Sequence, residues 1–328
     1  MDIKTLSAEL QTGKTNLDVF AQVLSELAAQ DRDLIVLTSD SRGSGRLVPF
    51  AEQFPDQLVE MGIAEQNMVA VSAGLASAGK KVFVVSPASF LTARGLEQIK
   101  NDVAYSDQPV KVVGISAGVS YGALGSTHHS LHDLAVLQAI NNVDIVVPAD
   151  NFETRQAVLA AYRHPRPIYL RFGKKAMPAT HASDERFEIG KAIQLTPAKD
   201  EYDVAYIACG ETVSAAFLAS QVLAEKGLAS CVLSLHTIRP LDETAILQAA
   251  RRAKAVVTVE EHSVNGGLGS RVASLLMQAG VFRPFRVVGF PDEHTFTGSQ
   301  AEIFEHYGIS APALAQAALR LLNPAGRE

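Results

Sequence analysis

The chain has 328 residues, of which 47% are hydrophobic and 20% charged, which excludes a disordered protein and suffices for two packed domains. Its net charge of −6 provides no electrostatic footprint for nucleic acid or for an anionic membrane. No apolar run reaches the ~18 residues that span a bilayer, and residues 1–4 do not have the pattern of a signal peptide, so we expect a cytoplasmic protein. Its two cysteines, Cys209 and Cys231, are expected to be buried thiols.

Short runs rich in Val, Ile and Leu alternate with longer helical segments. Such runs are typical of strands buried on both faces of a parallel sheet. In chain order, the first half is expected to hold helix 17–29, strand 34–38, helix 65–78, strand 81–85, helix 93–105, strands 110–115 and 144–147, helix 152–162 and strand 167–171. The second half is expected to hold strand 203–208, helix 213–225, strand 230–235, helix 243–252, strand 255–259, helix 268–278 and strand 285–288. The alternation predicts an α/β fold with right-handed crossovers.

One polar stretch interrupts the alternation. Residues 174–186 read KKAMPATHASDER, without periodicity and with a proline, which is typical of a linker between domains. We therefore expect two doubly wound domains with mostly parallel sheets, over 1–175 and 187–328, joined by a linker over 176–186.

A long Gly-rich loop follows strand 110–115 and contains three histidines. In open α/β sheets, ligands bind in the loops at the carboxyl ends of strands, and a loop of this length is often functional. His128 and His132 have the i, i+4 spacing of a metal pair, but no neighbouring side chain supplies a third ligand. We therefore favour histidines that begin a helix or bind a polar substrate, His129 included, and expect no metal on this chain.

Glu65 and Arg171 are the candidate charged site residues. Glu65 opens helix 65–78, where the helix dipole alone would account for a carboxylate. The many small residues of that helix imply close approach to another backbone, and burial there would raise the pKa of the carboxyl, as in catalytic acids. Arg171 ends strand 167–171 and is expected at a sheet edge, as an anion ligand or as a surface ion-pair residue.

Several segments, taken together, resemble the transketolase family. Those of the first half are similar to its pyrimidine-binding domain: GIAEQN at 62–67, SPASFLTARGLEQI at 86–99, YGALGSTHH at 121–129, VVPAD at 146–150 and PIYLRFG at 167–173. Those of the second half are similar to its C-terminal domain: VAYIACGETVSAAFLA at 204–219, LSLHTIRPLD at 233–242 and TVEEHSVNGGLGS at 258–270. The chain lacks the G-D-G motif with which the family holds magnesium and the cofactor diphosphate. The resemblance therefore implies the C-terminal subunit of a split transketolase.

The resemblance implies a thiamine diphosphate site. Glu65 matches the glutamate that hydrogen-bonds the aminopyrimidine ring nitrogen and favours the tautomer whose imino group removes the thiazolium proton. Phe90 matches the aromatic ring that stacks on the pyrimidine, and Asp40 matches an acid near the cofactor. The partner N-terminal subunit would hold the diphosphate and the magnesium.

The resemblance also implies substrate contacts. His128 matches a histidine that hydrogen-bonds the reacting oxygens, and Arg171 matches an arginine that holds the sugar phosphate in bidentate fashion. Ser44 lies near a phosphate-binding serine of the family. The chain departs from long single-chain transketolases at Pro87, Leu124 and Ser116, where an aromatic, an aspartate and a histidine would stand. These departures bear on the choice of donor sugar.

The implied function is transfer of a two-carbon ketol unit between a ketose and an aldose, expected to be phosphorylated, in an α₂β₂ assembly with the N-terminal subunit. One alternative is a pyruvate-using synthase or dehydrogenase component with the same cofactor. Another is an NAD-dependent oxidoreductase, against which the absence of G-x-G-x-x-G after strand 34–38 counts. A third is a non-catalytic subunit, against which Glu65, Phe90 and His128 count.

Overall fold

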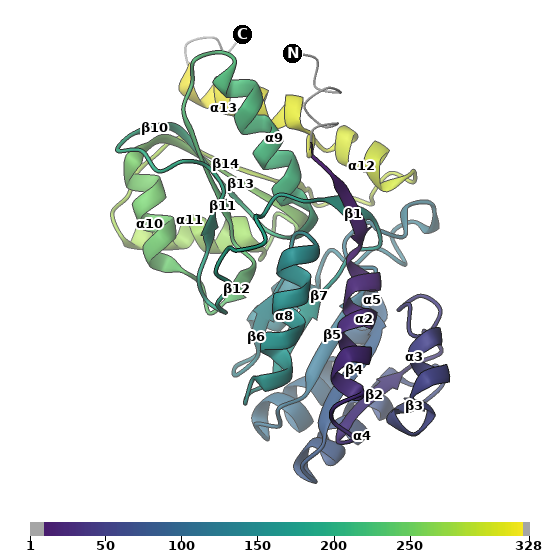
Figure 1. Ribbon diagram of the computed structural model, residues 1–328. Helices are drawn as coiled ribbons and strands as arrows, with labels where there is room; N and C mark the ends of the chain where they lie inside the picture. The colour runs from purple at the N-terminus through teal and green to yellow at the C-terminus, as the bar shows by residue number, and fades with distance from the viewer. Residues whose placement is uncertain (1–9, 324–328) are drawn as a thin grey trace.

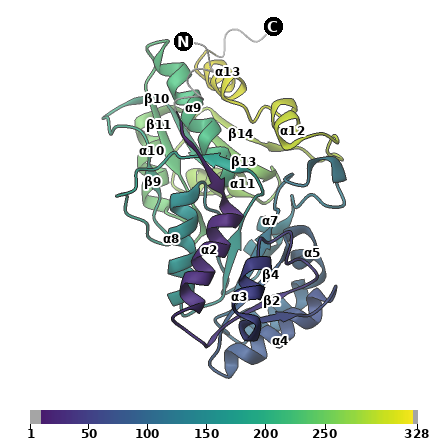
Figure 2. The ribbon, with the colours of Figure 1, turned by 45° about the vertical axis from the view of Figure 1, so that its right-hand side comes forward.

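The computed structural model describes residues 10–323, which form two α/β domains, one above the other in Figure 1 and Figure 2. The described strands make a seven-stranded, a five-stranded and a two-stranded sheet. None of the helices in this part of the chain has the length and apolar character needed to cross a membrane.

The seven-stranded sheet belongs to the first domain and is parallel except for one edge strand. Its order is β12 (Thr237–Arg239), β6 (Asp144–Val146), β7 (Ile168–Arg171), β5 (Lys111–Ile115), β4 (Lys81–Pro87), β2 (Leu34–Thr38) and β3 (Leu58–Glu60). The central strands β5 and β7 are buried along their whole length, as their continuous apolar sequences predict.

Helices cover both faces of this sheet. On one face, α2 (Asn16–Ala28) and α8 (Asn151–Arg163) lie side by side (Figure 1). Each helix has an N-cap side chain, Thr15 for α2 and Asp150 for α8, which accepts a hydrogen bond from a backbone N–H of the first turn. On the other face lie α4 (Glu65–Ser77), α5 (Ala88–Arg94), α6 (Leu96–Gln98) and the π-helix η2 (Ile99–Tyr105). Short elements complete the domain: α3 (Val48–Gln53), η1 (Pro55–Gln57), η3 (Gly122–Leu124) and α7 (Asp133–Gln138).

The single helix predicted over 93–105 is wrong, because the structure divides this region into α5, α6 and η2. The break lies at Gly95, which packs against α4. A Cβ at Gly95 would lie 2.9 Å from the Leu91 carbonyl oxygen and 3.2 Å from Val69. Close approach between helices thus sets the break, and the apolar periodicity of the sequence continues through it.

The second domain is built on the five-stranded sheet. Its order is β14 (Phe285–Phe290), β13 (Ala253–Ser263), β10 (Tyr202–Ala208), β11 (Ser230–Ser234) and the antiparallel β9 (Ile193–Gln194). One face is covered by α9 (Val213–Ala224), α12 (Gln300–His306) and α13 (Ala311–Leu322), and the other by α10 (Glu243–Arg252) and α11 (Leu268–Gln278). The short helix η4 (Gly210–Thr212) precedes α9. The two α/β domains with mostly parallel sheets are those predicted.

Chain segments cross between the domains. Strand β12, from the second half of the sequence, pairs with β6 at the edge of the first sheet. Within the predicted linker, β8 (Ala176–Pro178) pairs with β1 (Thr12–Thr15). His181 of the same stretch is buried and forms ion pairs with Asp150 and Glu153, each at 2.9 Å. The stretch is therefore anchored to the first domain.

Each sheet has a point where the strand order reverses. In the first sheet β2 lies between β3 and β4, so the loops after β2 and β4 diverge at a crevice along the carboxyl ends of the strands. In the second sheet β10 lies between β11 and β13. Ligands of open α/β sheets bind in such crevices, and the predicted cofactor residues follow β2, β3 and β4.

Candidate functional site

A carboxylate that sequence reasoning missed, Glu60, lies at the end of β3 and binds the segments that follow β2 and β3. Its Oε1 atom accepts the backbone N–H groups of Asp40 at 2.6 Å and Gly62 at 3.0 Å, and its Oε2 atom accepts the Thr38 hydroxyl at 2.9 Å. Partial burial raises the pKa of Glu60, but these donors and the nearby Arg42 outweigh burial and hold it below the usual range. The ionised Glu60 thus fixes the loop after β2 to the segment that leads into α4.

Asp40 and Ser44 lie in this loop. Asp40 is exposed and has a φ of +52°, a left-handed conformation that Asp tolerates better than most residues. Ser44 is half-buried. Both residues follow β2 and therefore lie beyond the carboxyl end of that strand, and their roles toward a cofactor or a phosphate remain predictions.

Glu65 is buried at the start of α4, with 3% of its surface exposed. Its Oε1 atom accepts a hydrogen bond of 2.9 Å from Nη1 of Arg94, at the end of α5. The Arg94 guanidinium also lies over the ring of Phe90, 4.5 Å from its centroid. Glu65 and Phe90, which the sequence predicts as partners at one pyrimidine ring, are therefore bridged by one planar side chain. Sequence reasoning missed Arg94.

The loop after β5 brings His128 to the same place. The His128 ring lies edge-on to Phe90, with centroids 5.3 Å apart, and edge-on to Tyr121 at 5.5 Å. Beyond Tyr121 lies Lys174, whose Nζ is 4.6 Å from the Tyr121 ring centroid. Among the described residues Lys174 forms no ion pair. A continuous row of contacting side chains therefore runs from the buried acid to a cation: Glu65, Arg94, Phe90, His128, Tyr121 and Lys174. Sequence reasoning missed Tyr121 and Lys174.

Two buried hydroxyls that follow β4 and β5 have no hydrogen-bond partner within the described part of the chain. They belong to Ser89, which precedes Phe90 in α5, and to Ser116, which follows β5 with a φ of +53°. Buried polar groups in native proteins are nearly always satisfied. The unpaired hydroxyls therefore fit a site that is completed by a polar ligand.

The other two histidines of the loop have separate structural partners. His129 donates from Nε2 to the Gly122 carbonyl at 3.0 Å and contacts the Thr295 hydroxyl through Nδ1 at 2.6 Å. Burial lowers the pKa of His129, in keeping with a neutral ring. His132 contacts Thr92 at 3.2 Å. Between residues 10 and 323, no three His, Cys, Asp or Glu side chains are grouped to hold a metal ion.

Arg171, the predicted sugar-phosphate ligand, has buried protein partners in the structure. Arg171 is 5% exposed and pairs with the fully buried Asp133 at 2.7 Å. It also donates to the carbonyl oxygens of Ser130 at 3.0 Å and Glu261 at 2.9 Å. These partners hold the guanidinium between the first domain and β13 of the second. Arg171 is thus held by protein partners, and its role as a sugar-phosphate ligand stays a prediction.

The second domain supports the site loop through buried acids at its own reversal point. Glu261 accepts the backbone N–H of Val119 at 2.9 Å, and Gln300 donates to both Glu261 and Glu211, at 2.9 and 2.8 Å. Burial raises the pKa values of Glu211 and Glu261 above the usual range. The loop that carries His128 is therefore held to the C-terminal domain by the hydrogen bond between Val119 and Glu261.

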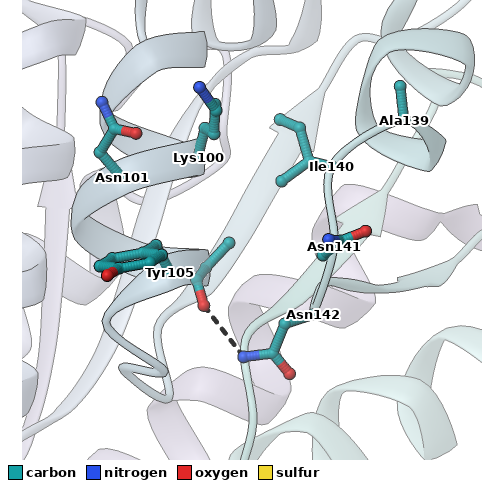
Figure 3. A pocket seen from close by; sticks show the side chains of 8 residues that line it. Lys100, Asn101, Tyr105, Ala139, Ile140, Asn141 and Asn142 are labelled. Carbon is teal, nitrogen blue, oxygen red and sulfur yellow. Dashed lines mark hydrogen bonds between the residues drawn. The ribbon is translucent and has the colours of Figure 1, made fainter.

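A separate hollow of about 770 Å³ lies between η2 and the segment before β6 (Figure 3). Tyr105 and Ile140 line it, and Asn142 Nδ2 donates to the Ala104 carbonyl at 3.0 Å across its floor. Because η2 precedes β5, this hollow lies at the amino ends of the strands. It contains none of the predicted site residues, and the crevice at the carboxyl ends remains the candidate site.

Comparisons with known proteins identify chains similar to this one along most of its length. Residues 13–180 match the family model "Transketolase, pyrimidine binding domain", and residues 193–314 match "Transketolase, C-terminal domain". The chain is 47% identical over 305 residues to one of the subunits of an apulose-4-phosphate transketolase of Phocaeicola vulgatus, covering 93% of this chain and 96% of the relative. It is 33% identical to a 6-deoxy-6-sulfo-D-fructose transketolase subunit of Clostridium sp., covering 92% of each. A solved structure, "Split gene transketolase, inactive beta4 tetramer", matches with a TM-score of 0.83 and 33% identity, over 95% of this chain and 99% of that one.

Proposed function

Because the chain belongs to the transketolase family, as the subunit of a split enzyme that carries the pyrimidine-binding and C-terminal domains, we propose that Glu65 and Phe90 form the aminopyrimidine side of its active site. The observation that carries the proposal is that the buried Glu65 carboxyl and the Phe90 ring are both in contact with the Arg94 side chain. The proposed reaction is ketol transfer between phosphorylated sugars.

The residues fit thiamine diphosphate. When bound, this cofactor supplies the carbon nucleophile that takes up the two-carbon unit. The Glu65 carboxyl would hold a proton at the pyrimidine ring nitrogen, and Phe90 would stack on the ring. The unpaired Ser89 and Ser116 hydroxyls provide polar atoms that a ligand can satisfy. His128 would donate to the substrate oxygens from the half-buried end of its loop.

We also propose the substrate class from the relatives. The relative at 47% identity is a transketolase for apulose 4-phosphate, a phosphorylated sugar, which makes this compound the first substrate to test. With Arg171 buried, Lys174 is the better candidate for the substrate's anionic group, because its ammonium lies at the open end of the row and has no ion-pair partner among residues 10–323. An ammonium accepts phosphate as a point charge.

The partner surface is proposed to surround Glu65. Ile63 is 72% exposed immediately before α4, and Val59 and Val71 are 38% and 36% exposed nearby. Ala70 and Gly74 are also exposed on α4, so another backbone can approach closely. We propose that the N-terminal subunit covers this face and holds the diphosphate and the magnesium, in an α₂β₂ assembly. The cytoplasmic location expected from the sequence stays a prediction.

Reconstitution tests the proposal. The chain is mixed with its N-terminal partner subunit, thiamine diphosphate and magnesium, and ketol transfer from apulose 4-phosphate to an aldose phosphate is measured. We expect activity only when both subunits are present. Ketol transfer by either subunit alone would contradict the shared site. Use of pyruvate as donor in place of a ketose by the assembled pair would support the synthase or dehydrogenase alternative.

A further inference from the structure

The position of Arg94 carries an inference that rests on the proposed function and extends it. Arg94 contacts Glu65 and Phe90 at the same time, through the 2.9 Å hydrogen bond to the carboxylate and the 4.5 Å stack on the ring. These are the two residues that a bound aminopyrimidine would contact. The guanidinium is planar, so it contacts the two groups that the ring would contact, but it offers the carboxylate an N–H donor where the ring offers a nitrogen acceptor.

We propose that Arg94 occupies the aminopyrimidine position in the cofactor-free subunit and must leave it when thiamine diphosphate binds. The two planar groups need the same space, between the Glu65 carboxylate and the Phe90 ring. They also need opposite states of Glu65. Arg94 pairs with the ionised carboxylate, whereas hydrogen bonding to a pyrimidine nitrogen acceptor requires the protonated carboxyl.

Arg94 is exposed enough for its side chain to rotate away from Glu65 and Phe90. Its side chain is 48% exposed, against 3% for Glu65, and it stands at the last residue of α5, before Gly95. Rotation of the exposed arm moves the guanidinium into solvent without disturbing the buried acid. The carboxylate cannot move similarly, because Glu65 is buried at the start of α4. Arg94 is thus a positioning residue whose departure frees Glu65.

The contacts that Arg94 loses set the expected effect. A half-exposed ion pair contributes about 0.2–1 kcal/mol and an exposed cation–π contact about 0.5–1 kcal/mol, so together they weaken cofactor binding by about 3- to 30-fold. Replacing Arg94 removes this competition. The affinity of the assembled enzyme for thiamine diphosphate is therefore expected to rise in Arg94→Met by that factor. Arg94→Lys, which keeps the charge without the planar fork, is expected to lie between the two.

The test is calorimetric titration of thiamine diphosphate, with magnesium, into the complex of this chain with its partner subunit. The matched control is Arg155→Met, because Arg155 is 43% exposed and pairs with Glu26 at 2.8 Å on a different surface. It is expected to bind as the wild type does. Weaker or unchanged binding by Arg94→Met would overturn the inference, since Arg94 would then be a cofactor ligand or a bystander. A wild-type complex that binds no thiamine diphosphate would overturn the proposed function and this inference together.

A crystal structure of the wild-type complex with thiamine diphosphate provides a readout that depends on no variant. We expect the Arg94 guanidinium to have left both Glu65 and Phe90, with the aminopyrimidine in its place. A bound cofactor beside an intact Arg94–Glu65 pair would overturn the inference and leave the proposed function standing.

Discussion

Replacement of Arg171 by leucine separates the structural role of this residue from the substrate role that the sequence suggests. Leucine keeps much of the volume and removes the guanidinium. The buried Asp133 then retains the Tyr169 hydroxyl at 2.8 Å as a donor, and the carbonyl groups of Ser130 and Glu261 each lose a hydrogen bond. We expect a large loss of stability.

The magnitude follows from the burial of the pair. Removing one partner of a buried ion pair costs about 3–5 kcal/mol, because the remaining charge stays buried without compensation. Domains of this kind unfold with about 5–15 kcal/mol, so the loss is a large share of the total. The double variant Arg171→Leu, Asp133→Leu removes both charges and is expected to recover part of it. Arg155→Leu breaks the surface pair with Glu26 and should cost at most about 1 kcal/mol.

The assay is equilibrium urea unfolding of the isolated chain, followed by circular dichroism, for these four proteins. A well-folded Arg171→Leu variant within about 1 kcal/mol of the wild type would refute the argument, since that is the range of a surface ion pair. If the same variant also had a raised KM for phosphorylated sugars alone in the assembled enzyme, Arg171 would be the phosphate ligand after all.

Further predictions concern charge, backbone and assembly. Burial lowers the pKa of His181, but Glu153 and Asp150 outweigh burial and raise it to about 10 from 6.5. The protonated His181 therefore stabilises the fold fully below pH 6.5, and this stabilisation is lost as the pH rises toward 10. The difference in unfolding free energy between the wild type and His181→Gln should shrink by up to about 1.4 kcal/mol per pH unit between these values. A difference that does not change with pH would contradict the ion pairs. Gly118→Ala should destabilise the chain more than Gly79→Ala in urea unfolding, because both have positive φ but only the Gly118 Cβ would collide with the Glu261 carboxyl group; equal losses would contradict the close approach. Ile63→Asp should abolish co-purification with the partner subunit while leaving the isolated chain folded, and retained assembly would move the interface elsewhere.

The parts of the fold that local sequence determines were predictable. Strand β2 has the predicted bounds, and β4, β5, β7 and β10 lie within a few residues of them, because each is a continuous apolar run between helices. Strand β12 was not predictable, since it pairs with β6, which lies far earlier in the chain. The break of helix 93–105 at Gly95 depends on the approach of α4, which no local pattern expresses.

In the site, too, the residues within motifs were predictable, whereas the contacts between distant segments were not. Glu65, Phe90 and His128 were named from motifs, and the structure brings them into one row; their catalytic roles remain predictions. Arg171 was named from a motif, but its burial was not predicted, because Asp133, which pairs with it, lies 38 residues away in the sequence. Arg94 lies within a quoted motif and was still missed, since only the fold shows that it reaches Glu65, 29 residues before it. Long-range ion pairs decide which charged residues remain available to ligands.

The most direct test of the account is the exchange of the thiazolium carbon proton with deuterated water, measured in the assembled complex of the Glu65→Gln variant with thiamine diphosphate. Glutamine keeps the size of the side chain and can hydrogen-bond, but it cannot transfer a proton to the pyrimidine nitrogen. With the cofactor still bound, exchange is expected to slow by at least about 10²-fold relative to the wild-type complex. Exchange at the wild-type rate in a correctly assembled variant would contradict the assignment of Glu65 as the acid of the cofactor site.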